Sequence, residues 1–486
     1  MQLNNGYRGR FDRAILVAAL GVFVLLGLTG VGWIAAAPAM LIVMGPLVLA
    51  AILVSLILGL KVVPTATRAF LSAFLIAVFV AVDFTIRPEG SPTRGALDLQ
   101  TLVKGFLYAL LLVFSIGMLR RSLADRSIWI LFSTYALVTS LSAIYSPTPL
   151  LALGSALAIL AIAVASGALS EMTKFEARAA WNWLFWAIAA MAAASLAMYL
   201  FVPDIAVASR VAGVGRLRGV TGAPNSLGPI LAIGIISAWF AIPQLASRGR
   251  TLLAVCALGM MIVALVLTGS RAAQFGLVIS AGVMFLVIAP RVGFVAISLA
   301  LLAVLTVVVF DWADFIGDAL VSAVSRSGRL DEITSFTGRN QIWAFCINKW
   351  AEAPWLGFGL GSPRAIISLG YVDQWGNTTG SAHNVVLESL LTSGVIGTSL
   401  LLLFWGTLFL ALVRKRVTLG TEGAADSRRL ADVLIGVTVF VAADGILEKS
   451  FAGVPSPATV LLGLVVATYY AVGNIIGPRP TRLRRR

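Results

Sequence analysis

The chain has few charged residues: Asp, Glu, Lys and Arg make up 12% of its 486 residues, whereas 59% are hydrophobic. Soluble domains carry about 25% charged residues, so the composition excludes a soluble enzyme or binding module. A bilayer-spanning helix uses roughly 20 apolar residues, and this chain has enough of them for about fourteen such helices. We therefore expect an all-α polytopic membrane protein with little mass outside the bilayer.

Cysteine and histidine are also scarce, with two cysteines and one histidine in the whole chain. Two cysteines cannot form the disulfide framework of a secreted domain, and Cys256 and Cys346 fall in dissimilar segments that we do not expect to meet. The sequence has no clustered His or Cys, no DxD pair, no P-loop and no Rossmann fingerprint. We expect no metal ion and no cofactor. If the protein needs a base near neutral pH, His383 is its only imidazole.

Hydropathy predicts about fourteen transmembrane helices, because only helices satisfy every backbone group within the hydrocarbon. Most basic residues fall in segments that are cytoplasmic if the N-terminus lies inside, so the net charge of +15 reports topology rather than nucleic-acid binding. This pattern puts both termini in the cytoplasm. The predicted spans are 14–34, 39–60, 69–86, 99–118, 127–145, 149–169, 181–202, 226–246, 251–268, 272–290, 292–310, 385–412, 431–452 and 457–477.

Three arginines depart from this topological rule. Arg218, Arg271 and Arg339 fall in segments expected on the outer face, where basic residues are depleted. A guanidinium is permanently charged and binds a phosphate through two parallel hydrogen bonds, so these side chains are candidates for contacts with a phosphate. For each of them, ion pairing with a nearby carboxylate or solvation is the alternative.

The longest outer segment covers residues 311–384 and contains an amphipathic stretch, TGRNQIWAFCINKWAEAP. Its start and stop signals predict a helix over 337–353. The helix has an apolar stripe that contains Ile342, Cys346 and Trp350. We expect this helix to lie flat on the membrane, with Trp343, Trp350 and the following Trp355 in the headgroup zone.

His383 lies at the start of the twelfth predicted span, in GSAHNVVLESLL, where Asn384 and Glu388 share one helix face. A lone interfacial histidine is ordinarily a hydrogen-bonded cap, but three outer arginines on the same side favour a chemical role. Five ionisable residues inside the spans are functional candidates by default, with internal pairing to a lysine as the structural alternative. They are Asp83, Glu388, Asp444, Glu448 and Lys449.

Asp311, Asp314 and Asp318 recur at helical spacing just beyond the eleventh predicted span. Three carboxylates on one helix face could bind a metal ion, and a solvated helix exit explains them equally. The sequence leaves open whether they bind a metal.

Four stretches resemble the successive signatures of the O-antigen ligase and polysaccharide polymerase superfamily, and together they cover roughly residues 205–410. They are RGVTGAPNSLG, LTGSRAA, TGRNQIWAFCINKWAEAPWLGFGLGS and SAHNVVLESLLTSGVIG. The resemblance implies a GT-C-like membrane glycosyltransferase of the bacterial inner membrane. Such an enzyme inverts the anomeric centre, needs no metal, and uses an undecaprenyl-diphosphate-linked glycan at the periplasmic face.

The same resemblance assigns roles to individual residues. His383 matches the catalytic histidine, and Arg218 and Arg271 match the arginines that hold the donor diphosphate. Arg216 is a neighbour that could take the place of Arg218. Arg339 matches the TGR element of the periplasmic loop, which we also assign to the donor diphosphate. The chain has about two more predicted spans than a typical ligase.

The resemblance also suggests a division of the chain, with N-terminal helices over 1–204, a catalytic region over 205–412 and C-terminal helices with a basic cytoplasmic tail over 413–486. The acceptor is either lipid A core, as for a ligase, or a second lipid-linked glycan, as for an O-antigen or exopolysaccharide polymerase. A lipid-linked glycan flippase or transporter is the alternative from another class. It is expected to show an internal repeat and a polar route through the membrane, and the sequence shows neither.

Overall fold

The computed structural model describes eight stretches of the chain: residues 68–85, 99–119, 126–211, 214–245, 247–292, 339–372, 378–419 and 425–473. Several predicted features lie outside the described residues. These are the spans 14–34 and 39–60, all but the first residue of 292–310, the three aspartates Asp311, Asp314 and Asp318, and the basic tail after residue 473.

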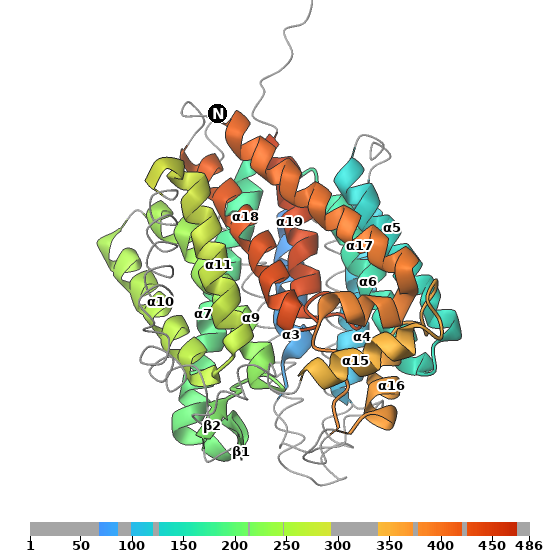
Figure 1. Ribbon diagram of the computed structural model, residues 1–486. Helices are drawn as coiled ribbons and strands as arrows, with labels where there is room; N and C mark the ends of the chain where they lie inside the picture. The colour runs from blue at the N-terminus through green and yellow to red at the C-terminus, as the bar shows by residue number, and fades with distance from the viewer. Residues whose placement is uncertain are drawn as a thin grey trace, which may run out of the picture.

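The described helices run up and down through one bundle, with a few short elements at its lower end (Figure 1). They are α3 (Arg68–Asp83), α4 (Leu99–Met118), α5 (Ser127–Leu141), α6 (Pro149–Leu169), α7 (Lys174–Phe201), α8 (Pro203–Ala206), α9 (Pro224–Ala241), α10 (Arg248–Thr268), α11 (Arg271–Ile288), α15 (Arg339–Trp350), α16 (Ser362–Gly370), α17 (Val385–Thr418), α18 (Ala425–Leu447) and α19 (Pro457–Gly473). Short 3-10 turns, Ser142–Tyr145 and Ile242–Gln244, extend α5 and α9.

Eight of the described helices are long and apolar enough to cross a membrane, counting α5 and α9 with the turns that extend them. They are α5, α6, α7, α9, α10, α11, α17 and α18, and shorter apolar helices lie within α4 and α19. This confirms the prediction of an all-α polytopic membrane protein. The total of fourteen spans and the GT-C-like arrangement stay predictions.

Several predicted span boundaries differ from the structure, among them the end of α17, at Thr418 rather than 412, and the start of α18, at Ala425 rather than 431. Helix α7 begins at Lys174 rather than at 181, because Thr173 and Glu176 form a capping box at its start. Helix α18 ends at Leu447 rather than at 452, and Ser450 then adopts a φ of 46° in the loop that follows. Glu448 and Lys449 therefore lie in a loop at the end of α18 and not inside a span.

Helices α9, α18 and α19 form the buried centre of the bundle. Helix α11 packs along α18 and α9, while α10 packs on α9 and α7. The outward sides of α10 and α11 carry exposed apolar side chains, among them Leu252, Val266 and Val278. A lipid-facing surface accounts for these side chains, since soluble proteins rarely expose continuous apolar area of this kind.

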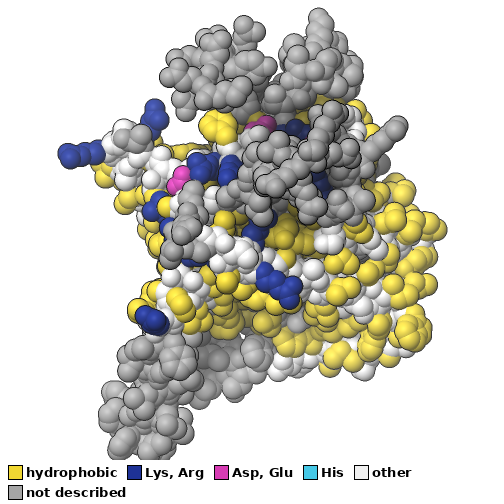
Figure 2. Space-filling model, turned by 90° about the horizontal axis from the view of Figure 1, so that it is seen from above, with side chains coloured by type: hydrophobic (Ala, Val, Ile, Leu, Met, Phe, Trp, Pro, Cys, Tyr) yellow, Lys and Arg dark blue, Asp and Glu magenta, His cyan; other side chains and the backbone are white. Residues whose placement is uncertain are grey.

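Basic side chains gather at one end of the bundle, as the view onto that end shows (Figure 2). Several have acidic partners there: Arg178 lies 3.1 Å from Asp426, and Arg416 pairs with Asp432. At this end α3, α5, α7, α10 and α18 begin and α17 ends (Figure 1). Because α17 and α18 run through the bundle, His383 and Glu448 lie at the opposite end.

The predicted outer segment 203–225 contains a β-hairpin, the one β-sheet among the described residues. Strands β1 (Val207–Val211) and β2 (Val214–Leu217) pair antiparallel, with Ala208 opposite Arg216. The chain after the hairpin is tied to the end of α3, where the Thr85 N–H donates to the Val220 carbonyl at 2.9 Å. The hairpin thus holds the start of α9 against its neighbours at the lower end of the bundle.

Helix α17 is interrupted at Gly394, which has a φ of 61° and a ψ of −161°. A loop before α16 fills the interruption and takes over the hydrogen bonds that the helix loses there. The N–H groups of Phe358 and Gly359 donate to the carbonyls of Leu391 and Thr392, at 2.7 and 3.0 Å. In the other direction, the Val395 N–H donates to the Pro354 carbonyl at 2.8 Å. These bonds fix α15 and α16 relative to the first turns of α17.

We expect Gly394→Ala to lower the thermal unfolding temperature of the purified protein strongly. The backbone at Gly394 occupies a region almost restricted to glycine, which alone costs about 1–3 kcal/mol for another residue. A Cβ there would also lie 2.3 Å from the Trp355 carbonyl carbon. Gly406→Ala is the matched control, since a Cβ at Gly406 on the same helix meets nothing within 4 Å. Equal unfolding temperatures for the two variants would contradict this account of the kink.

The apolar stripe of α15 packs against protein. Ile342 and Cys346 are buried in a cluster with residues of α16, α17 and the turn before α17, namely Ile367, Leu391 and Ala382. The prediction that this stripe lies on the membrane is therefore wrong, because α16 and α17 cover it. Trp355 is 69% exposed, so its role as a headgroup anchor stays a prediction. Cys256 and Cys346 are both free thiols, as expected.

Candidate active site

His383 lies in the turn that leads into α17. Asn384 caps this helix, and its Oδ1 accepts hydrogen bonds from the N–H groups of Val386 and Leu387, at 2.9 and 3.0 Å. Its Nδ2 donates to the Ile446 carbonyl at 3.0 Å, which ties the cap to the end of α18. His383 has a φ of 47°, in the left-handed region that residues other than glycine seldom adopt. The cap and this backbone conformation together set the direction of the imidazole.

Both ring nitrogens of His383 have partners. Nδ1 lies 3.0 Å from Glu448 Oε2, and Nε2 lies 3.1 Å from Thr379 Oγ1. An ionised carboxylate can only accept a hydrogen bond, so the ring proton belongs on Nδ1. In the neutral ring Nε2 then accepts a hydrogen bond from the Thr379 hydroxyl. The His383 side chain is 26% exposed, so part of the imidazole is accessible from outside the protein.

Glu448 connects His383 to two other elements. Its second oxygen, Oε1, accepts hydrogen bonds from Arg339 Nη2 at the start of α15 and from Asn225 Nδ2 at the start of α9, both at 2.8 Å. Asn225 Oδ1 in turn accepts from Arg216 Nη2 at 2.6 Å. A continuous chain of hydrogen bonds therefore runs from the imidazole through one carboxylate to two guanidinium groups.

The environment of Glu448 keeps its carboxyl group ionised. Burial by itself raises the pKa, but the hydrogen bond from His383 and the charges of His383, Arg339 and Lys449 outweigh it and hold the pKa below its usual value of 4.5. The stabilisation from these partners is fully present above about pH 4.5 and is lost as the pH falls through the lower pKa of the folded state. At neutral pH Glu448 is thus an anion that can orient the imidazole.

Arg216 is held between β2 and the turn that joins α10 to α11. Its Nε donates to the Thr268 carbonyl at 2.8 Å, and its Nη2 donates to the Gly269 carbonyl at 3.2 Å. Arg271 begins α11 two residues after Gly269 and is half-buried. The turn LTGSRAA thereby places the Arg271 backbone beside the guanidinium of Arg216.

Arg218 is placed differently from the other predicted site residues. It is buried, with 4% of its surface exposed, and its Nε donates to the Ile205 carbonyl of α8 at 2.7 Å. The structure therefore brings His383 and Arg339 together on Glu448. It adds Arg216 through Asn225, whereas Arg218 donates to α8.

Two residues of this network were not among the predicted site residues. From the sequence, Glu448 was a functional candidate only because it is an ionisable residue within a predicted span. No role was predicted for Asn225. Both had a signal in the sequence: Glu448 is an acid at the end of an apolar stretch, and Asn225 belongs to the motif RGVTGAPNSLG. Neither signal identifies a partner, because both residues are far from His383 in the chain.

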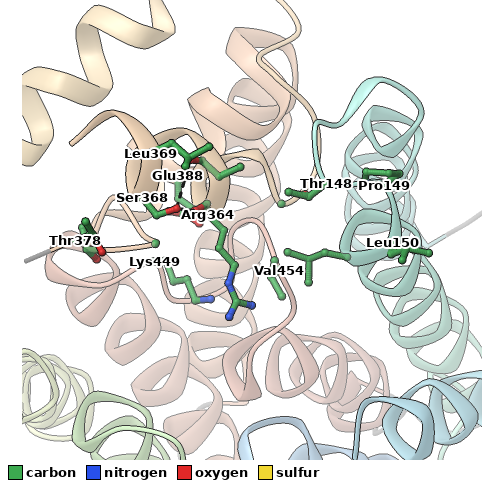
Figure 3. Close-up of a pocket in the computed structure, with 15 residues that line it drawn as sticks. Thr148, Pro149, Leu150, Arg364, Ser368, Leu369, Thr378, Glu388, Lys449 and Val454 are labelled. Carbon is green, nitrogen blue, oxygen red and sulfur yellow. Dashed lines mark hydrogen bonds between the residues drawn. The ribbon is translucent and has the colours of Figure 1, made fainter. Parts of the chain in front are cut away.

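A cavity of about 730 Å³ lies next to the segment 378–380, a few residues before His383 (Figure 3). It is bounded by the start of α6, by α16, by residues 378–380, by Glu388 of α17 and by the loop after α18. Thr379 lines this cavity and contacts Nε2 of the imidazole. Thr379 therefore connects the imidazole to the cavity, which His383 itself does not line.

The fold and the site define a polytopic membrane protein with a histidine, a carboxylate and several arginines at one end of its helical bundle. Residues 256–402 match the model of a family described as O-antigen ligase. The match includes Arg271, Arg339 and His383, and it confirms the resemblance to the O-antigen ligase and polysaccharide polymerase superfamily. No curated protein matches the chain.

Proposed function

We propose that the protein transfers an undecaprenyl-diphosphate-linked glycan to an acceptor hydroxyl, with inversion and without a metal ion. The family match supports a membrane glycosyltransferase of the ligase or polymerase type. The observation that carries the proposal further is the placement of His383 and Arg339 on the two oxygens of Glu448, at 3.0 and 2.8 Å. A base and a phosphate-binding group are thus held together by one buried carboxylate.

In the proposed reaction His383 acts as the general base. The acceptor oxygen forms a bond to the anomeric carbon of the donor glycan, while the bond from that carbon to the diphosphate oxygen breaks. The electron pair leaves with the diphosphate, and the proton of the acceptor hydroxyl passes to Nε2 of His383. Glu448 holds Nδ1–H and stabilises the imidazolium that forms, which keeps the basic nitrogen directed at the acceptor.

The leaving diphosphate gains negative charge as the bond breaks, and fixed cations stabilise that charge without reorganisation. Arg339 and Arg271 were assigned to this role from the sequence. Arg216 joins them because its guanidinium lies in the same hydrogen-bonded chain as Glu448. Arg216 lies on β2 and Arg218 lies just after it. Arg218 is the weaker candidate for this role, because only 4% of its surface is exposed.

We expect Arg271→Gln to weaken binding of the lipid-linked donor by about 10- to 100-fold, the effect of losing one or two charged hydrogen bonds to phosphate. The measurement is donor binding to the purified protein in lipid nanodiscs. Arg250→Gln is the matched control, since Arg250 is an exposed arginine near the start of α10 at the basic end of the bundle. Unchanged donor affinity in Arg271→Gln would remove Arg271 from the donor site.

We further propose that the site faces the periplasm of a bacterium and that the protein lies in its inner membrane. The support comes from charge: the site lies at the end of the bundle opposite the basic end (Figures 1 and 2). Basic residues accumulate on the cytoplasmic side of membrane proteins. The same rule puts both chain termini in the cytoplasm.

Reconstitution of the protein into vesicles distinguishes transfer of the glycan from transport of the lipid-linked donor. Purified protein in vesicles, supplied with lipid-linked glycan and an acceptor, is expected to form a new glycosidic bond and to release undecaprenyl diphosphate. Translocation of the donor without bond formation would support a flippase and overturn the proposed function. The acceptor class is read from a deletion strain: accumulated single repeats indicate a polymerase, and accumulated long unligated chains indicate a ligase.

A further inference from the structure

The cavity next to residues 378–380 carries two cations from different parts of the fold. Arg364 comes from α16 and Lys449 from the loop after α18, and both side chains line the cavity (Figure 3). Thr148, Ser368 and Thr379 add hydroxyl groups to the lining. Together these side chains offer two positive charges and several hydrogen-bond donors to one ligand group.

One acid also lines the cavity. Glu388 is 3% exposed, and its Oε2 accepts hydrogen bonds from the Ala382 N–H at 2.9 Å and from Ser381 Oγ at 3.5 Å. These bonds direct its carboxylate toward the turn that carries His383. The charged side chains of the lining are therefore two cations and one carboxylate, and Lys449 also interacts electrostatically with Glu388 and with Glu448. The lining keeps an excess of one positive charge, which favours an anion.

The cavity has an apolar border as well as a cationic interior. Leu150 of α6 and Leu369 of α16 line it and are 62% and 82% exposed. Exposed leucines beside a cationic pocket suit a ligand that has a charged headgroup and remains attached to lipid. A free soluble sugar would gain nothing from such a border.

The position of the cavity relative to the imidazole distinguishes it from the arginine cluster. Arg339 and Arg216 reach His383 from the Nδ1 side, through Glu448. The cavity reaches it from the Nε2 side, through Thr379. A base that takes a proton through Nε2 requires the attacking hydroxyl on that side. An acceptor hydroxyl that enters from the cavity would reach Nε2 by taking the place of the Thr379 hydroxyl.

We propose that this cavity is the acceptor site and that Arg364 and Lys449 bind a phosphate group of a membrane-bound acceptor. The assignment to the acceptor rests on the proposed function of His383, whereas phosphate binding stands on the cavity alone. Two acceptors share this chemistry: a phosphorylated lipid A core, and a second glycan on a lipid diphosphate. A guanidinium and an ammonium on one phosphate would fix the acceptor while its hydroxyl reaches the imidazole.

The test is direct binding to purified protein in lipid nanodiscs, which does not depend on transfer. The probes are a phosphorylated core oligosaccharide, the same oligosaccharide after removal of its phosphates, and geranyl diphosphate. We expect Arg364→Gln to bind at least one phosphorylated probe about 10- to 100-fold more weakly than wild type. Arg364→Lys is expected to retain most of the affinity, and Arg250→Gln all of it. If Arg364→Gln binds the phosphorylated core oligosaccharide more weakly than wild type does, the acceptor is lipid A core. If the variant binds only geranyl diphosphate more weakly, the acceptor is a lipid-linked glycan.

Two results would overturn the proposal. One is unchanged affinity of Arg364→Gln for both phosphorylated probes, and the other is an equal loss for the dephosphorylated oligosaccharide. In a transfer assay, the variant is expected to raise the KM for the acceptor and to leave the KM for the donor unchanged. A raised donor KM alone would assign the cavity to the donor. If wild type binds the probes but forms no glycosidic bond, the transferase function fails while the phosphate site stands.

Discussion

Replacement of His383 by alanine is expected to abolish glycan transfer while the lipid-linked donor still binds. Loss of a general base lowers turnover by about 10²–10⁴-fold, and His383 is the only histidine of the chain. Donor affinity is expected to stay within about twofold of wild type, because the proposed diphosphate contacts come from arginines. The assay measures formation of the glycosidic bond by the purified protein, together with separate donor binding.

The backbone at His383 calls for a second variant. Its φ of 47° is more easily adopted by asparagine than by alanine, so His383→Asn tests the base with less disturbance of the turn. Asparagine can still donate a hydrogen bond to Glu448 but cannot take a proton from a hydroxyl. Wild-type rates in either variant would remove His383 as the base and with it the proposed mechanism.

Glu448→Gln is expected to lower turnover by about 10²-fold, the lower end of what a general base contributes. Glutamine has nearly the same shape but no charge, so it can no longer stabilise the imidazolium that forms on His383. Arg339 also loses its carboxylate partner, at present 2.8 Å away. The measurement is kcat and the KM of each substrate, and Glu448→Asp is expected to restore part of kcat.

A merely structural role for Glu448 predicts a different result. Asp432→Asn is the matched control, because Asp432 is also a buried carboxylate paired with an arginine, Arg416, at the opposite end of the bundle. We expect that variant to be less stable than wild type and to keep its kcat. If Glu448→Gln loses stability in the same measure and keeps its kcat too, Glu448 does not position the imidazole.

Much of the helical architecture was predictable because apolar composition and length set it locally. The predicted span 149–169 coincides with α6, and the predicted span 99–118 coincides with α4. Errors arose where side chains decide the boundary. Thr173 and Glu176 start α7 seven residues before the predicted span, and the loop after Leu447 ends α18 five residues before the predicted end.

The kink in α17 shows a different limit of prediction. Gly394 lies in an apolar stretch that reads as one continuous helix, and nothing nearby in the sequence indicates a break. The break exists because residues 354–359, far away in the chain, supply the hydrogen bonds that the helix gives up. The same packing covers the apolar stripe of α15. The stripe was predicted to face the membrane, but it packs against α16 and α17.

Composition and short motifs were enough to predict the membrane-embedded helical class and the resemblance to the superfamily, and to select His383 as a candidate. The groups that meet this histidine follow from the packing of the helices, because they lie far apart in the chain. Glu448, Asn225 and Arg216 come from separate elements, and only the packing of α9, α17 and α18 brings them within hydrogen-bonding distance of one another. The structure likewise set Arg216 rather than Arg218 in the network, because the strand and the turn after it direct neighbouring guanidinium groups to different partners.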